Sequence, residues 1–322
     1  MTILYYWNQL YPKLLRDLSK FYSLPPLDAR PSNQYALIDA AQVLDSRAKK
    51  MLLDRFKGVG LFSFTLEHGI EEYGPLLISI NALEEKNRAH ILSFMRNGWT
   101  VSYLNSCLSL PELAKHLSKY LNGRLVDGRS VLVRYYDPRL LPSFLECLDA
   151  DIVSSLMAPI ARWAWWSREM KLITQVGPNI CVADDFSEIK ISKKTQDTLA
   201  VLARNDLIRS MVIDSADDDE FEGWLPHAFH QAVTEQVKHA EGVGLTNLSD
   251  IYLFVSLSLR IHPNFFSLLS LDQKIEKIGQ SEINMPHLVL TITDDEWNAL
   301  AHEGQSTLKR LQASITEKLC RN

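Results

Sequence analysis

Residues Trp99–Glu112 read WTVSYLNSCLSLPE, and they contain the clearest transition from strand to helix in the chain. Residues 99–104 have the β-branched and aromatic content of a strand. Ser109 and Glu112 then form a capping box, in which each side chain bonds the backbone N–H of the other residue and so starts a helix. The stretch therefore predicts a strand that is followed closely by a helix.

The same alternation extends along the chain in both directions. Strands are expected at 35–39 and 76–80 before this stretch and at 130–136 after it, with helices at 48–56, 89–95 and 110–121. Short apolar strands that alternate with amphipathic helices predict an α/β layer around a central sheet, with some parallel pairing of its strands.

The chain as a whole predicts a two-lobed α/β protein. Residues 1–32 are expected to form an N-terminal helix and a linker, residues 33–166 a mixed α/β, sandwich-like lobe, and residues 167–322 a mainly α-helical C-terminal lobe. In the last part we expect short strands at 172–176 and 180–183, helices around 199–211, 226–239 and 247–261, a helix that begins at the capping box 293–296, and a last helix at 306–319.

Composition and charge narrow the class of protein. The 322 residues are 46% hydrophobic and 23% charged, as in ordinary globular proteins, and the net charge is −5. A domain that mainly grips nucleic acid is basic, so no nucleic-acid partner is expected. Residues 1–166 carry 19 Lys and Arg against 16 Asp and Glu, whereas residues 167–322 carry 15 against 23. The acidic charge therefore lies in the C-terminal half.

The cysteines and the apolar segments indicate a cellular location. Cys107, Cys147, Cys181 and Cys320 form no Cys-x-x-Cys pair, and scattered cysteines are typical of a reducing compartment. The first residues lack the pattern of a signal peptide. The longest apolar stretch, around Ile251–Leu259, is too short to cross a bilayer, so no stable membrane insertion is expected. We expect a cytoplasmic protein.

Motifs that carry chemistry are not found in the sequence. It has neither a phosphate-binding glycine loop nor a Gly-x-Ser-x-Gly nucleophile motif. His227-x-x-His230 is the best metal-ligand pair, but we interpret it as a pair of surface histidines at a solvated helix start, near the acidic run 217–220. We therefore expect no cofactor, no metal and no catalytic residues. A small-molecule enzyme with catalytic residues dispersed along an α/β scaffold remains the alternative.

Residues 134–139, Arg-Tyr-Tyr-Asp-Pro-Arg, form the sharpest polar constellation. Asp137 is a good helix cap and Pro138 suits a first helical position. Arg134 and Arg139 can pair with Asp137, which would make a structural ion pair at a strand-to-helix junction. They can also reach a carboxylate of a partner, and both interpretations stay open.

The order of these pieces resembles a known family. The matching runs are Tyr35–Ala41, Gly74–Ile78, Gly98-Trp99, Leu113 with His116-Leu117, Asp127-Gly128, Val131–Arg139, Phe144-Leu145, Leu148, Pro159-Ile160 and Trp163. Over about residues 33–166 the chain is similar to the Tap/TEC effector adaptors, or chaperones, of bacterial type VI secretion systems. The C-terminal half matches only loosely.

The resemblance implies a function and partners. Such adaptors are not enzymes; they bind one cognate toxic effector in the cytoplasm, usually through its N-terminal region, stabilise it, and help to load it on the VgrG spike or its PAAR tip. On this basis we expect a cleft between the lobes that shields an apolar segment of the effector. Our candidate residues for its apolar wall are Trp99, Tyr103, Trp163 and Trp165, and our polar candidates are Arg134, Tyr136, Asp137 and Arg139.

Overall fold

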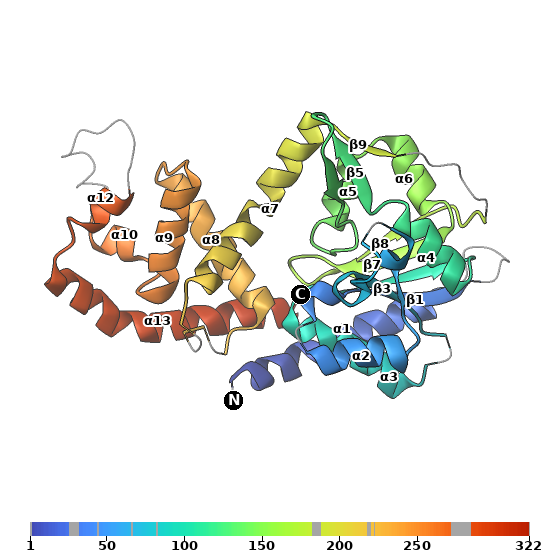
Figure 1. Ribbon diagram of the computed structural model, residues 1–322. Helices are drawn as coiled ribbons and strands as arrows, with labels where there is room; N and C mark the ends of the chain where they lie inside the picture. Colours follow the sequence, from blue (N-terminus) through green and yellow to red (C-terminus); the bar gives the residue numbers. More distant parts are fainter. Residues whose placement is uncertain are drawn as a thin grey trace. The chain divides into compact units, whose positions relative to one another are not determined.

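The computed structural model describes residues 2–25, 32–43, 45–65, 67–81, 83–181, 188–217, 220–221, 223–271 and 285–321 (Figure 1). The chain forms two compact units. One unit is the segment Leu10–Leu202, called the sheet unit below. The other combines Met1–Gln9 with Ala203–Asn322 and is called the helical unit. The sheet unit thus continues beyond residue 166, where the sequence suggested a lobe boundary.

The sheet unit is built on a six-stranded sheet with the strand order β2-β3-β1-β4-β7-β8. Every pairing in it is antiparallel, so the expected parallel pairing is wrong for this sheet. All seven residues of β7 are buried, and so are all six of β4, because both strands lie inside the sheet with both faces covered. The strands are β1 Asn33–Asp39, β2 Val59–Gly60, β3 Pro75–Ser79, β4 Val101–Ser106, β7 Ile160–Trp166 and β8 Leu172–Val176.

A second, three-stranded sheet has the order β6-β5-β9, from β5 Asn122–Leu125, β6 Ser130–Leu132 and β9 Ile189–Ile191. It contains the parallel pair of the described residues, β5 with β9. The strand expected at 130–136 ends at Leu132. Val133 N–H still bonds the Leu121 carbonyl, and the chain then turns, because Asp137 N–H bonds the Arg134 carbonyl. The expected strand at 180–183 is absent at residues 180 and 181, and residues 182 and 183 lie outside the described residues.

One helix of the sheet unit begins at a cap that the sequence predicts. The capping box predicted at Ser109 and Glu112 is confirmed at the start of α4 Leu110–Ser118. Helix α1 Thr2–Ser23 lies beside α3 Glu85–Ser93, and the Tyr11 hydroxyl donates to the Ala89 carbonyl at 2.7 Å (Figure 1). The other helices are α2 Ser46–Asp54, α5 Leu141–Cys147 and α6 Ala150–Met157, with short 3-10 turns at Ala40–Gln42, Leu61–Phe64, Glu71–Tyr73 and Phe94–Asn97.

The core of the sheet unit joins both sheets and the helices α4 to α6. Leu37, Leu77 and Leu104 contribute from neighbouring strands, and Tyr135 and Trp163 stack edge to face in its middle with ring centroids 6.1 Å apart. Burial of each large apolar side chain contributes about 1.5–3 kcal/mol. The core therefore includes aromatic residues that the sequence placed in a cleft wall.

The helical unit contains α8 Pro226–Gly242, α9 Leu248–Arg260, α10 Phe265–Leu268, α12 Met285–Val289 and α13 Asp294–Arg321, and α7 Lys193–Asp214 leads into it. The mixed fold class is therefore confirmed. The two last helices expected from the sequence are one helix, α13, which begins at the predicted Thr293 capping box. Gly304 lies inside α13, where no larger residue fits, because a Cβ there would lie 1.7 Å from the Ile261 carbonyl oxygen.

Cysteine pairing differs from the expectation. Cys107, just after β4, and Cys181, five residues beyond β8, are joined in a disulfide, with Cα atoms 6.1 Å apart. The two residues are 74 positions apart in the chain, so their spacing gives no signal of the pairing. Among the described helices, none is both long and apolar enough to cross a membrane.

Candidate functional site

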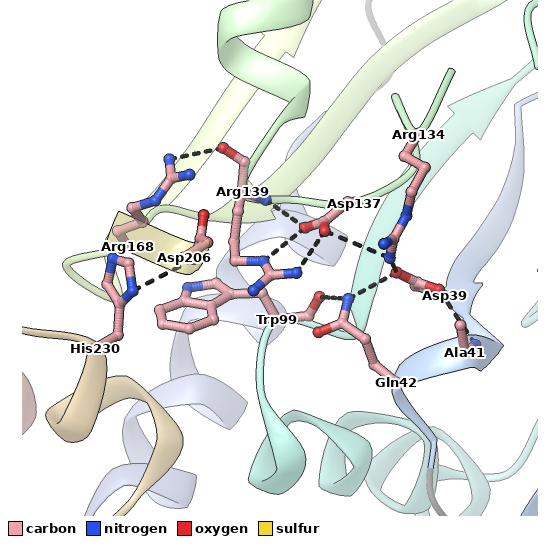
Figure 2. A network of polar contacts seen from close by, with 10 residues as sticks. All are labelled: Asp39, Ala41, Gln42, Trp99, Arg134, Asp137, Arg139, Arg168, Asp206 and His230. Carbon is pink, nitrogen blue, oxygen red and sulfur yellow. Dashed lines mark hydrogen bonds and ion pairs between the residues drawn. The ribbon is translucent and has the colours of Figure 1, made fainter. Parts of the chain in front are cut away.

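The candidate site is a buried polar network at the end of β1 (Figure 2). Asp39, the last residue of the strand, is completely buried. Its Oδ1 accepts the backbone N–H of Ala41 at 3.2 Å, and its Oδ2 accepts from Gln42 Nε2 at 2.7 Å. Gln42 also donates to the Trp99 carbonyl at 3.2 Å. A single carboxylate therefore fixes the turn after β1 and, through Gln42, the start of β4.

Arg134 connects Asp39 with Asp137. Its Nη2 donates to Asp39 Oδ2 at 2.7 Å and lies 3.7 Å from Asp137 Oδ2. Burial by itself would lower the pKa of the Arg134 guanidinium, but the charges of Asp39 and Asp137 outweigh it and raise that pKa. The Arg134 side chain still keeps 39% of its surface exposed, whereas Asp39 and Asp137 keep 0% and 1%. Of these three charged side chains, Arg134 is therefore the one that meets solvent.

Asp137 and Arg139 form the tightest pair of the network. Asp137 Oδ1 accepts from both the backbone N–H and Nε of Arg139, each at 3.0 Å, and Asp137 Oδ2 accepts from Arg139 Nη2 at 2.6 Å. A forked guanidinium–carboxylate contact of this kind is among the stronger hydrogen-bonded pairs in proteins. The structural ion pair foreseen from the sequence is confirmed. Helix α5, however, begins at Leu141 rather than at Pro138, because residues 137–140 form a separate turn.

Arg139 extends the network to the β7–β8 hairpin. Figure 2 shows its guanidinium over the Trp99 ring, with the central carbon 5.9 Å from the ring centroid. Arg168 Nη1 donates to the Arg139 carbonyl at 2.7 Å, and Trp99 Nε1 donates to the Ser167 carbonyl at 2.9 Å. The network thus ties β1, the start of β4, the 133–140 loop and the hairpin into one rigid junction.

Comparison with known proteins identifies the segment that carries this junction. Residues 34–154 match the family model of DUF4123, a domain of unknown function. The match includes Asp39, Trp99, Arg134, Asp137 and Arg139, so it covers most of the network but less than half of the chain. No curated protein and no solved structure matches the chain.

Five of the eight predicted site residues meet within the DUF4123 region. Trp99, Arg134, Asp137 and Arg139 form the network, and Tyr136 packs beside it with its ring 5.9 Å from the Arg134 guanidinium carbon. Burial first, and then the charge of Asp39, raise the pKa of Tyr136, which keeps its hydroxyl neutral. Tyr136 is itself 2% exposed, so it supports the junction from inside.

The other three candidates lie in the core. Trp163 donates from Nε1 to Ser102 Oγ at 3.0 Å and is completely buried. Trp165 is 2% exposed. Tyr103, 1% exposed, packs edge to face against Tyr22 and Trp166. Trp99 is also 1% exposed, so none of the four aromatic residues offers a surface to a partner in this conformation.

Sequence reasoning missed Asp39, Gln42 and Arg168. Asp39 did carry a signal, because a carboxylate that ends the apolar run Tyr35–Ile38 needs a buried partner. The identity of that partner had no signal, since Arg134 lies 95 residues further along the chain.

The histidine pair lies in α8 of the helical unit. His227 is 0% and His230 3% exposed, so the expected solvated surface position is wrong. His230 Nδ1 lies 3.4 Å from Asp206 Oδ1. Within the described residues, no group of three or more His, Cys, Asp or Glu side chains is placed to hold a metal ion. Residues 218 and 219 of the acidic run lie outside the described residues.

Proposed function

We propose that this chain is a non-enzymatic adaptor that binds one cognate effector of a type VI secretion system. The observation that carries the proposal is the overlap of two segments of the chain. The resemblance to effector adaptors covers about residues 33–166, and the DUF4123 match covers residues 34–154. In this proposal the chain stabilises the effector, through the effector's N-terminal region, and helps to load it on the VgrG or PAAR spike.

Contact with the effector is proposed at the solvent side of the buried network. Arg134 presents its exposed guanidinium there, held by Asp39 and oriented for a carboxylate of the partner. Leu132, two residues earlier, is 41% exposed and adds apolar surface. A charged side chain that buried partners already hold in place loses little conformational entropy on binding. This preorganisation favours specific recognition over non-specific electrostatic attraction.

The helical unit is proposed to select the cargo by charge. Residues 203–322 contain 18 Asp and Glu against 10 Lys and Arg. An acidic unit attracts a basic segment of a partner and repels an acidic one, so it discriminates among effectors before close contact forms.

The test is affinity capture of the tagged full chain from the organism that produces it, with mass spectrometry. The expected result is one large toxin-like protein, with or without a spike component, enriched over a tag-only control. Arg134→Ala is expected to lower the yield of that protein at least about tenfold, the loss of roughly 1.4 kcal/mol of binding free energy. The matched control is Arg129→Ala, which removes an exposed arginine whose ion partner, Asp127, is exposed as well.

Other results would reject the adaptor proposal or the contact site at Arg134. If no protein is enriched and a metabolite instead raises the melting temperature of the chain, the small-molecule enzyme becomes the better hypothesis. If both arginine variants retain the partner equally, the effector binds away from Arg134. Circular dichroism of each variant separates loss of binding from loss of fold.

The adaptor proposal includes a cytoplasmic location, which the cysteines can test. Cytoplasmic reductants keep most thiols reduced. Alkylation of intact cells before lysis is expected to label Cys107 and Cys181 if the chain resides there. Both cysteines protected from the label would instead place the chain in an oxidising compartment.

A further inference from the structure

Strand β8, residues Leu172–Val176, forms an exposed edge of the six-stranded sheet, which we call the β8 edge. It pairs with β7 on one side, and within the described residues no strand pairs with its other side. Residues 173–176 are all exposed, with Ile173 at 40% and Val176 at 55%. Side chains on both faces of the β8 edge are therefore accessible.

The register with β7 fixes which backbone groups point outward. Ser167 N–H bonds the Lys171 carbonyl and Gly177 N–H bonds the Ala161 carbonyl, so alternate residues from 171 to 177 bond β7. The N–H and C=O groups of Leu172, Thr174 and Val176 consequently point away from the sheet. Gln175 Nε2 makes one long contact with the Val176 carbonyl, at 3.5 Å, which a backbone N–H of another strand would replace.

The β8 edge lacks the usual protection of edge strands. Proteins guard such edges with lysine, proline, bulges or very short strands. The opposite edge of this sheet follows that rule, because β2 has only two residues. Leu-Ile-Thr-Gln-Val has five residues, no charge and no proline, and it pairs with β7 without a register shift.

The sequence of the β8 edge is complementary to itself in antiparallel pairing. With a twofold axis at Thr174, the outward-facing Thr174 meets Thr174 of a second copy, and Leu172 meets Val176 of that copy. Each of these pairs exchanges two backbone hydrogen bonds. Apolar pairs and threonine pairs across strands are stabilising, and no like charges face each other. Ile173 lies opposite Gln175 of the second copy.

We propose that two copies of this chain associate through their β8 edges, with Thr174 on the twofold axis, and so join their sheets into one continuous sheet. The proposal is independent of effector binding. The contact is smaller than the roughly 1,600 Å² of a standard stable interface, so the dimer is expected to be weak and to depend on concentration.

Sedimentation of the purified full chain tests the association itself. The average mass is expected to rise from 36.8 kDa toward twice that value as the concentration is raised from about 5 μM to about 500 μM, a range in which small interfaces associate. A chain that stays monomeric over this range overturns the proposal.

Charge substitutions at the axis test the register. Thr174→Lys and Thr174→Glu each place like charges opposite each other, so each variant alone is expected to be monomeric. An equimolar mixture of the two is expected to recover association, because only the mixed pair places opposite charges at the axis. Gln175→Lys is the matched control, because it adds the same charge opposite Ile173 rather than opposite its own copy, and it is expected to retain most of the association.

The outcomes separate clearly. If the wild type associates and both Thr174 variants associate equally well, the contact lies elsewhere and the proposal is overturned. Failure of the mixture to associate would overturn the register. Thr174→Pro gives an independent check, because the Thr174 N–H makes no bond to β7 and proline is tolerated on edge strands. It is expected to abolish association while far-UV circular dichroism stays that of the wild type.

Discussion

Two Asp-x-Arg pairs, ten residues apart, have nearly the same geometry in very different surroundings. In each pair the aspartate Oδ1 accepts the backbone N–H of the arginine two positions on, at 3.1 Å for Asp127 and 3.0 Å for Asp137. In each, the second carboxylate oxygen meets the guanidinium, at 2.7 Å and 2.6 Å. The side chains of Asp127 and Arg129 are 51% and 72% exposed, whereas those of Asp137 and Arg139 are 1% and 14% exposed.

The difference shows that burial, rather than geometry, decides what an ion pair does. An exposed pair competes with water and salt and contributes little to stability. A buried pair has given up its hydration, so removing one partner leaves the other charge uncompensated. The pair at Asp127 fastens a turn, whereas the pair at Asp137 holds a junction of four segments.

The largest expected effect is that of Asp137→Ala. It leaves Arg134 and Arg139 without their shared carboxylate, so the free energy of unfolding is expected to fall by about 3–5 kcal/mol. Urea denaturation measures it, with Asp127→Ala as the matched control, which should lower the unfolding midpoint far less. Equal losses in the two variants would show that the surroundings do not matter.

A double-mutant cycle sharpens the comparison. Arg139→Met keeps an apolar stem near the Trp99 ring but leaves Asp137 with Arg134 at 3.7 Å as its remaining side-chain ion partner, and it should cost about 2–3 kcal/mol. Adding Asp137→Asn should cost less than the sum of the single changes, by about 1–3 kcal/mol. Additive costs would mean that the two side chains act independently. The same cycle at Asp127 and Arg129 is expected to be additive.

A smaller effect is expected in the titration of Asp127. The hydrogen bond from the Arg129 side chain, followed by the one from its backbone N–H, lowers the pKa of Asp127. A lowered folded-state pKa adds stability above the unfolded-state pKa, and this contribution is lost as the pH falls through the folded-state pKa. Arg129→Gln should raise the pKa of Asp127 toward its usual value, which NMR titration measures. An unchanged pKa would mean that the backbone contact acts alone.

The smallest expected effect is that of salt, which should weaken the exposed Asp127–Arg129 pair but not the buried Asp137–Arg139 pair. At about 1 M NaCl the screening length falls to roughly 3 Å. The pKa of Asp127 is therefore expected to move part of the way back toward its usual value. The difference in unfolding midpoint between Asp137→Ala and the wild type should persist at the same salt concentration. Its disappearance would place the Asp137 pair in contact with solvent.

Local signals in the sequence located most elements but not their pairing. The capping boxes at Ser109 and Thr293 predicted two helix starts correctly, because their hydrogen bonds lie within four residues. The direction of strand pairing had no such signal. Helix α2 follows β1, as in a parallel unit, but the chain then forms the short strand β2 and returns as β3, which runs antiparallel to both β2 and β1.

The site shows the same limit. The Asp137–Arg139 pair could be predicted because both partners lie within one turn of chain, whereas the bond from Arg134 to Asp39 spans 95 residues. From the sequence alone, Trp163 and Trp165 of β7 fit a cleft wall as well as a core, because large aromatic residues suit both cores and interfaces. Only the place of β7 between β4 and β8, with both of its faces buried, decides for the core.

The division of the chain into units also has a consequence for biosynthesis. Residues 1–9 leave the ribosome long before residues 203–322, yet both segments belong to the same compact unit. The sheet unit, Leu10–Leu202, is contiguous and can fold while translation continues, as domains commonly do. Residues 1–9 cannot pack into the helical unit until nearly two hundred further residues have been synthesised. The helical unit is therefore completed late, after translation of the sheet unit.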